Sequence, residues 1–151
     1  MKIKIKYHDG MDDIKKIKQG DWIDLKAARD VFVPYMGLVN IPLGVSMKLP
    51  DGCEAIVLPR SSTFKRYGII MANSAGVIDN SYSGTNDVWQ FPAFCLVPND
   101  IDEETGNAGS YIEEGTRICQ FRVQRRMPAV EFEEVEALDD EDRGGFGSTG
   151  K

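Results

Sequence analysis

The sequence predicts an all-β fold, a distorted jelly roll or β-sandwich of short strands with one short helix and a flexible, glycine-rich C-terminal arm. Between Val31 and Leu58, short apolar runs alternate with Pro and Gly. Regularly spaced short strands of this kind are typical of sandwiches and jelly rolls. No long helical period occurs, apart from a possible helix over Thr63 to Tyr67. Residues 139–151 combine Gly with Ser and Thr, which favours a flexible arm.

Length and composition limit the classes of protein. A chain of 151 residues can bury a core, so we expect one domain over 1–151, with 139–151 as its arm. The net charge of -6 argues against nonspecific binding to nucleic acid, which needs a basic face. The first residues are too polar for a signal peptide and no apolar run approaches a membrane span. We therefore expect no membrane contact and a cytoplasmic location.

The three cysteines, Cys53, Cys95 and Cys119, stand singly in apolar surroundings, and the chain has no CxxC pair. An odd number of isolated cysteines predicts small buried hydrophobic residues in a reducing compartment, not disulfides or metal ligands.

The first strands are predicted by alternation and by length. Lys2 to Tyr7 alternates lysine with apolar residues, as a half-buried strand does. Asp21 to Ala28 resembles a short strand that ends in a turn. Val45 to Leu49 and Cys53 to Leu58 have strand length, with turn residues on both sides.

A polar cluster follows Pro59, a residue that does not fit inside a central strand. Arg60, Ser61 and Ser62 suit an anionic ligand, because a guanidinium forks onto phosphate oxygens while hydroxyls donate to the others. A second interpretation, with Ser62 as a helix N-cap and Arg60 on the surface, is compatible with the first.

A second polar cluster follows the apolar residues Val77 and Ile78. We predict a β-hairpin over Asn73 to Gly84, with the chain reversing around residues 74–76. Asp79 would then lie at the end of an apolar strand, where a carboxylate is a reasonable general base. The two clusters together predict a phosphate-bearing substrate that is hydrolysed by an activated water.

The second half of the chain begins with an alternating aromatic pattern over Asn86 to Leu96, which is most simply explained as sheet core. Pro98 to Gly115 is polar and is predicted to be a surface loop. Gly115 then leads into a strand. Strict alternation would place Arg117, Cys119 and Phe121 on one side of this strand and Ile118 and Gln120 on the other.

The C-terminal arm contains one arginine and one aromatic residue among its glycines. Arg143 can add charge at phosphate oxygens, and Phe146 can stack on a flat base while glycine N–H groups converge on an anion. A nonspecific linker is the alternative, but this composition favours a lid.

Five stretches in this order, Asp21 to Ala28, Pro59 to Gly68, Asn73 to Gly84, Gly115 to Gln120 and Arg143 to Gly150, resemble the motifs of the trimeric dUTP pyrophosphatases (dUTPases). The stretch 84–87, and an arginine only three residues before Phe146, resemble the Bacillus/phage-like branch. The resemblance implies hydrolysis of dUTP to dUMP and pyrophosphate, which keeps uracil out of DNA and supplies dUMP for thymidylate synthesis. It also implies Mg²⁺ as cofactor and a homotrimer whose active sites are shared between subunits.

The resemblance also implies residue roles. Asp79 would activate the attacking water, and Asp24 would touch, through water, a Mg²⁺ ion held mainly by the triphosphate. Tyr82 would pack against the deoxyribose and exclude a 2′-OH, while Gln120 would help to hold the phosphates. Phe91 is an alternative to Phe146 for covering uracil, although core packing explains it equally well. The expected substrate-binding residues are Arg60, Ser61, Ser62, Asn73, Gly76, Val77, Ile78, Tyr82, Phe91, Gln120, Arg143, Gly145, Phe146, Gly147 and Ser148.

Two other functions are compatible with parts of these motifs. A dCTP deaminase shares the Arg-Ser-Ser and Ile-Asp patterns, but it needs a glutamate near the base, and none occurs between Arg60 and Asn99. A nucleotide-dependent regulator would bind a protein partner, which is expected only if a phage encodes the chain.

Overall fold

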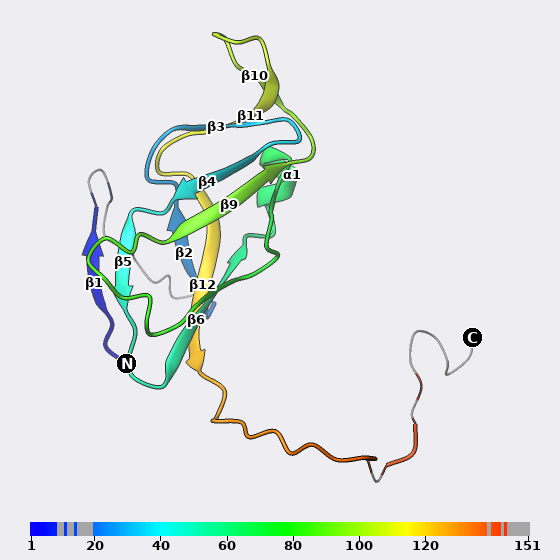
Figure 1. Ribbon diagram of the computed structural model, residues 1–151. Helices are drawn as coiled ribbons and strands as arrows, with labels where there is room; N and C mark the ends of the chain where they lie inside the picture. The colour runs from blue at the N-terminus through cyan, green and yellow to red at the C-terminus, as the bar shows by residue number, and fades with distance from the viewer. Residues whose placement is uncertain (9–10, 12–13, 15–19, 139, 143, 145–151) are drawn as a thin grey trace.

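Short antiparallel strands form four small sheets around one core in the computed structural model, which describes residues 1–8, 11, 14, 20–138, 140–142 and 144 (Figure 1). The arrangement is the predicted distorted jelly roll, and the single helix of the described residues is α1 (Thr63–Tyr67). In order of neighbouring strands, the sheets are β1 (Lys4–Tyr7) and β5 (Val45–Lys48); β10 (Asp100–Ile101), β11 (Ala108–Ile112) and β3 (Val31–Pro34); β2 (Ile23–Lys26), β12 (Arg117–Arg125), β6 (Cys53–Pro59) and β8 (Gly76–Ile78); and β4 (Leu38–Pro42), β9 (Gln90–Cys95) and β7 (Ile69–Met71).

The core lies between the sheets and contains Trp89 and Phe91 of the predicted aromatic pattern, whereas Phe94 is only half-buried. Trp89 and Phe121 meet edge to face, with ring centroids 5.3 Å apart and planes at 84°. Every second residue of β9 points inward, so Phe91 is 0% exposed. Cys95 and Cys119 are buried free thiols, as predicted for the cysteines, whereas Cys53 is only half-buried.

Two sequence-based predictions were wrong in detail. The chain does reverse after Met71, with Ser74 at φ 61°, but it forms no hairpin: β7 pairs with β9, whereas β8 pairs with β6. The turn is therefore a corner between two sheets, which local sequence signals do not distinguish from a hairpin. The predicted loop Pro98 to Gly115 contains the paired strands β10 and β11, and β11 also pairs with β3.

A β-bulge at the start of β12 changes which residues share a face. Arg117 pairs with Lys26 of β2 and Cys119 pairs with the next residue, Leu25, so Ile118 is the extra residue. Ile118 and Cys119 are both buried, whereas Arg117 and Gln120 point outward. The alternation predicted for this strand was wrong because a bulge shifts the order of faces by one residue.

Thr63, the first residue of α1, holds the bulge in place. Its hydroxyl donates to the Ile118 carbonyl at 2.6 Å and accepts the Arg60 N–H at 3.2 Å. The Arg60 N–H also lies 3.3 Å from the Ile118 carbonyl. Because Thr63 is 1% exposed, these bonds are shielded from water and connect α1 and the end of β6 to β12.

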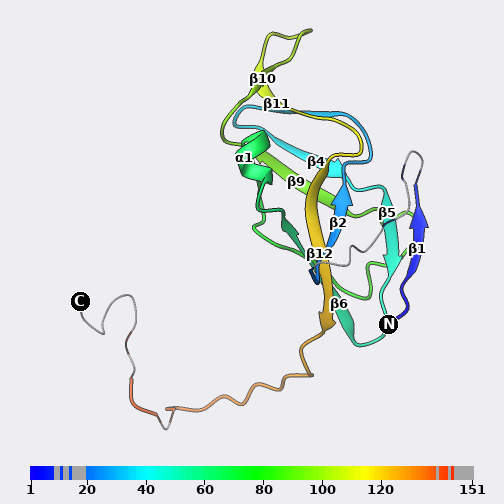
Figure 2. The same cartoon turned by 180° about the vertical axis from the view of Figure 1, so that it is seen from behind.

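The chain leaves the body after β12. Figures 1 and 2 both show residues 126–138 running away from the sheets as an extended segment, and these residues are exposed. Their apolar members include Val130, 51% exposed, and Phe132, 93% exposed. Within the described ranges, no helix has the length and apolar character needed to cross a bilayer.

Replacing Thr63 by Val should lower the free energy of unfolding by about 1–3 kcal/mol, because the buried Ile118 carbonyl loses its hydroxyl donor. Thermal unfolding followed by circular dichroism measures this change. Thr63→Ser keeps the hydroxyl and serves as the control. Equal stability of the Val variant and the wild type would show that the bond does not support the bulge.

Candidate active site

Asp24 lies between two arginines on the outer face of the β2–β12–β6–β8 sheet. Its Oδ1 is 2.8 Å from Nε of Arg60, and its Oδ2 is 3.2 Å from Nη1 of Arg117. The side chains of Asp24 and Arg60 are 19% and 26% exposed, so this pair is partly shielded from solvent. Two cations and one carboxylate leave a local excess of positive charge on a chain whose net charge is -6, as an anion-binding site requires.

Gln120 lies in the same corner. It pairs with Asp24 on one side and with Leu58 on the other, so these three side chains share the outer face of the sheet. The structure thus brings together Asp24, Arg60 and Gln120, three of the residues expected to act on the triphosphate.

The two serines of the Arg-Ser-Ser cluster lie beside this corner. Ser62 is the N-cap residue of α1 by position, but its side chain makes no capping bond, and Thr63 makes the local bonds instead. Ser61 is exposed in the preceding turn.

Asp79 follows β8 and is exposed. Its Oδ1 accepts hydrogen bonds from the hydroxyl of Ser81 at 2.5 Å and from the backbone N–H of Ser81 at 2.6 Å. Because these bonds favour the ionised form, they hold the pKa of Asp79 below its ordinary value, with the hydroxyl as the larger cause. The carboxylate is therefore charged and fixed at one oxygen, which suits a base that positions a water at the other.

Tyr82 is 41% exposed and is fixed through its hydroxyl, which donates to the Val88 carbonyl at 3.2 Å. The turn between them is closed by Asp87, whose Oδ2 accepts the Gly84 N–H at 2.6 Å. The ring is thus held in the loop that follows Asp79.

The remaining residues of this second cluster line the corner before Asp79. Gly76 is buried, and a Cβ there would lie 3.1 Å from Cε of Met71 and 3.3 Å from Cβ of Val57. Asn73 is exposed in the turn and Val77 is 61% exposed, while Ile78 packs partly against the core.

The two clusters lie at opposite edges of one sheet, because β2 and β8 are its outer strands. Through Gln120, Asp24 lies level with Leu58 of β6. Ile78 pairs with Ala55 of the same strand, so Asp79 lies level with Glu54, four residues along β6 from Leu58. At strand spacings this separates Asp24 from Asp79 by about 13 Å along the strands and about 14 Å across them. One triphosphate does not reach both clusters within a single copy of the chain.

Phe91 does not reach either cluster. With its ring fully buried, it is unable to stack on a base, and the core-packing interpretation is the one the structure supports. The expected arm residues Arg143, Gly145, Phe146, Gly147 and Ser148 lie outside the described residues.

Sequence reasoning missed three residues that support the site: Arg117, Thr63 and Ser81. Arg117 was placed on the wrong face because alternation does not reveal a bulge. The spacing of Asp79 and Ser81 does predict their contact, because a loop Asp side chain commonly accepts the backbone N–H of the residue two positions later.

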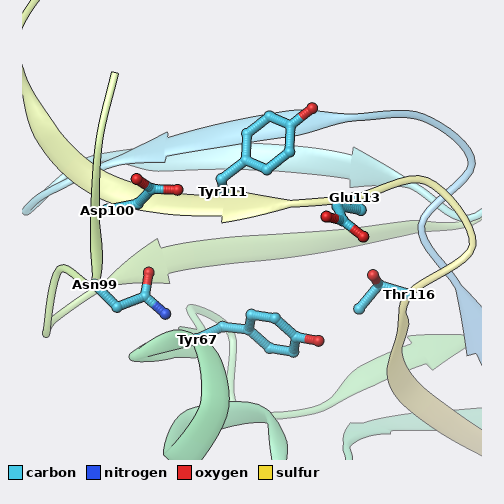
Figure 3. Close-up of a pocket in the computed structure, with 6 residues that line it drawn as sticks. All are labelled: Tyr67, Asn99, Asp100, Tyr111, Glu113 and Thr116. Carbon is cyan, nitrogen blue, oxygen red and sulfur yellow. The ribbon is translucent and has the colours of Figure 1, made fainter. Parts of the chain in front are cut away.

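A shallow pocket of about 300 Å³ lies elsewhere, between α1 and β11 (Figure 3). Its lining contains two carboxylates and no cation, which does not suit a triphosphate. Figure 3 shows the Tyr111 hydroxyl pointing away from the other labelled side chains. The lining residues are Tyr67, Asn99, Asp100, Tyr111, Glu113 and Thr116.

The described residues contain no group of three or more His, Cys, Asp or Glu that would hold a metal ion. Asp24 is a single carboxylate that already pairs with two arginines. This donor set fits a Mg²⁺ ion that arrives on a triphosphate, because Mg²⁺ usually keeps several waters and binds one or two carboxylates together with substrate phosphates.

Comparison with known proteins agrees with this arrangement. The chain is 52% identical over 151 residues to the SPbeta prophage-derived deoxyuridine 5'-triphosphate nucleotidohydrolase of Bacillus subtilis, with 99% of each chain covered. It is 36% identical over 140 residues to the deoxyuridine 5'-triphosphate nucleotidohydrolase of Corynebacterium glutamicum, with 91% of this chain and 86% of the relative covered. The first match confirms the Bacillus/phage-like branch.

Solved structures share the fold at low sequence identity. The dUTPase of Staphylococcus bacteriophage 80alpha, solved with dUPNHPP, superposes with a TM-score of 0.77 at 18% identity, covering 99% of this chain and 98% of that one. The dUTPase of Streptococcus mutans gives a TM-score of 0.70 at 20% identity, covering 84% and 98%. A family model described as dUTPase matches residues 14–93. By sequence, fold and arrangement of motifs, the chain belongs to the dUTPase family.

Proposed function

We propose that this protein is a dUTP diphosphatase, which hydrolyses dUTP to dUMP and pyrophosphate and so keeps uracil out of DNA and supplies dUMP for thymidylate synthesis. The observation that carries the proposal is the corner formed by Asp24, Arg60 and Gln120 in a chain of the dUTPase family. Its positive side chains and amide suit phosphate oxygens, and Asp24 suits a Mg²⁺ ion held mainly by the triphosphate. When bound, that ion neutralises charge on the phosphates.

In the proposed reaction Asp79 takes a proton from a water that attacks the α-phosphorus. The bond from this phosphorus to the bridging oxygen breaks, and pyrophosphate leaves with the bonding electrons. Ser81 holds Oδ1 of Asp79, which leaves Oδ2 to position the water. Catalysis is then mainly orientation and charge neutralisation, shared by Arg60, Ser61 and Gln120.

Specificity for a deoxyribonucleotide is proposed to rest on the second cluster. The fixed ring of Tyr82 would leave no room for a 2′-OH. Backbone groups of residues 76–78, together with Asn73, would recognise uracil through hydrogen bonds. Because Phe91 is buried, Phe146 is the proposed cover for the base, and Arg143 and the arm residues Gly145, Gly147 and Ser148 would close over the phosphates.

The separation of the two clusters supports an active site shared between copies of the chain. In a homotrimer, the corner at Asp24 of one subunit would meet Asp79 of a neighbour. The exposed apolar residues of segment 126–138, among them Val130 and Phe132, support the crossing of this segment onto another subunit. Three free thiols support a reducing compartment, the cytoplasm, for this assembly. Binding of a regulatory protein partner stays a prediction. Turnover of dUTP would neither support nor contradict it.

Asp79→Asn should lower the turnover of dUTP by about 10²-fold or more while dUTP binding is largely kept, because only the base is removed. Product analysis with dUTP and dCTP, in magnesium buffer and then in EDTA, measures this. Wild-type turnover in the variant would refute the assignment of the base. Ammonia release from dCTP would show a deaminase instead, and tight binding of dUTP without any product would show a regulator.

Ser81→Ala should shift the acid limb of kcat/KM to higher pH. Asp79 acts as a base only above its pKa, and the Ser81 hydroxyl lowers that pKa, so its removal raises the pH at which activity is lost. Asp51, which contacts Asn80, and Glu54 at the start of β6 are the carboxylates nearby in the fold. Ser83→Ala, in the same loop, should keep the wild-type profile. An unchanged limb in the Ser81 variant would disprove the proposed tuning.

Mixing two inactive variants tests the shared site. Arg60→Gln and Asp79→Asn subunits, refolded together at equal amounts, should regain about one quarter of wild-type activity. A site is active only where an intact Arg60 meets an intact Asp79, and this is one of the four equally frequent pairings of the two variants. Each variant refolded alone is the control. If the mixture stays inactive although mass spectrometry shows mixed oligomers, both residues act within one subunit.

A further inference from the structure

We propose that Arg117 is a positioning residue, which holds Asp24 so that Arg60 keeps its terminal N–H groups for the triphosphate. This inference rests on the proposed function, because it concerns how the same corner binds its substrate.

The bulge of β12 is what delivers Arg117 to Asp24. In a regular strand Arg117, three residues before Gln120, would face the core side. With Ile118 as the extra residue, Arg117 points outward beside Gln120 and its Nη1 lies 3.2 Å from Oδ2 of Asp24. The buried bond from Thr63 to the Ile118 carbonyl stabilises this arrangement.

The two arginines take different oxygens of one carboxylate. Arg60 contacts Oδ1 through Nε, and Arg117 contacts Oδ2. Arg117 is 51% exposed, against 19% for Asp24, so its contact with Oδ2 lies nearer to solvent than the contact of Arg60 with Oδ1.

A carboxylate with a single arginine favours a two-pronged pair, in which both oxygens accept from one guanidinium. Such a pair would use a terminal nitrogen of Arg60 as well as Nε. Because Arg117 occupies Oδ2, Arg60 contacts Asp24 through Nε, and in this proposal the N–H groups of its two terminal nitrogens remain for the triphosphate. Arg117 therefore acts on the substrate through Asp24 and Arg60.

The test is the affinity of Arg117→Gln for dUPNHPP, the α,β-imido analogue of dUTP, measured by calorimetry in magnesium buffer. We expect Kd to rise about tenfold, the effect of losing one charge-assisted hydrogen bond. The affinity for dUMP, which lacks the outer phosphates, should change less than about twofold. With dUTP, KM should rise while kcat stays within about threefold of wild type.

Two matched variants and one double variant separate positioning from other effects. Arg117→Lys restores a cation at Oδ2 and should recover part of the affinity. Arg125→Gln, on the same strand, removes one charge and should bind like wild type. In an Asp24→Asn background, Arg117→Gln should cost less than about twofold, because the carboxylate that it positions is gone.

The same tenfold loss in the Asp24→Asn background would show that Arg117 acts as a simple cation on the phosphates, and would overturn the inference. An affinity of Arg117→Gln equal to that of Arg125→Gln, or an equal loss for dUMP, would also overturn it. The proposed function fails if the wild type does not turn over dUTP. That result is independent of the Kd measurement, which uses an analogue that is not hydrolysed.

Discussion

The hydrogen bond from the Thr63 hydroxyl to the Ile118 carbonyl supports the rest of the site. It fixes the extra residue of β12, and through the Arg60 N–H it ties the end of β6 to the same carbonyl. The bulge in turn decides that Arg117 points outward and that Gln120 and Asp24 share a face. Three segments far apart in the chain are thereby brought to one corner, which gathers positive charge on an otherwise acidic protein and so suits an anion.

The two clusters of candidate site residues lie at opposite edges of one sheet. The edge at β2 carries charge and is partly shielded, because Asp24 and Arg60 lie against the body of the protein. The edge at β8 carries an exposed carboxylate and an exposed tyrosine, each held by a local hydrogen bond, which is short at Asp79 and longer at Tyr82. Each edge is preorganised by itself, and in the proposed shared site a productive geometry would depend on how copies of the chain meet.

The fold class, the helix Thr63–Tyr67 and most strands follow from the sequence, because period-two patterns and turn residues act locally. The corner at residues 72–75 and the strand pairs of β10 and β11 do not, since which sheet a strand joins depends on distant partners. Asp24, Arg60 and Gln120 were found together as expected. Arg117 was not, because a one-residue bulge is invisible to alternation, and the burial of Phe91 followed only from packing.

The distance between Asp24 and Asp79 has a consequence for inheritance as well as for chemistry. In the proposed shared site, a chain with a defective Asp79 would inactivate the site that it forms with one neighbour and would still supply its Asp24 corner to the site that it forms with another. In a cell that makes a normal and a defective version of such a subunit, the defective subunit would therefore also inactivate sites to which a normal subunit contributes. Dominance would be set by how the copies mix, and not by the fold of either chain alone.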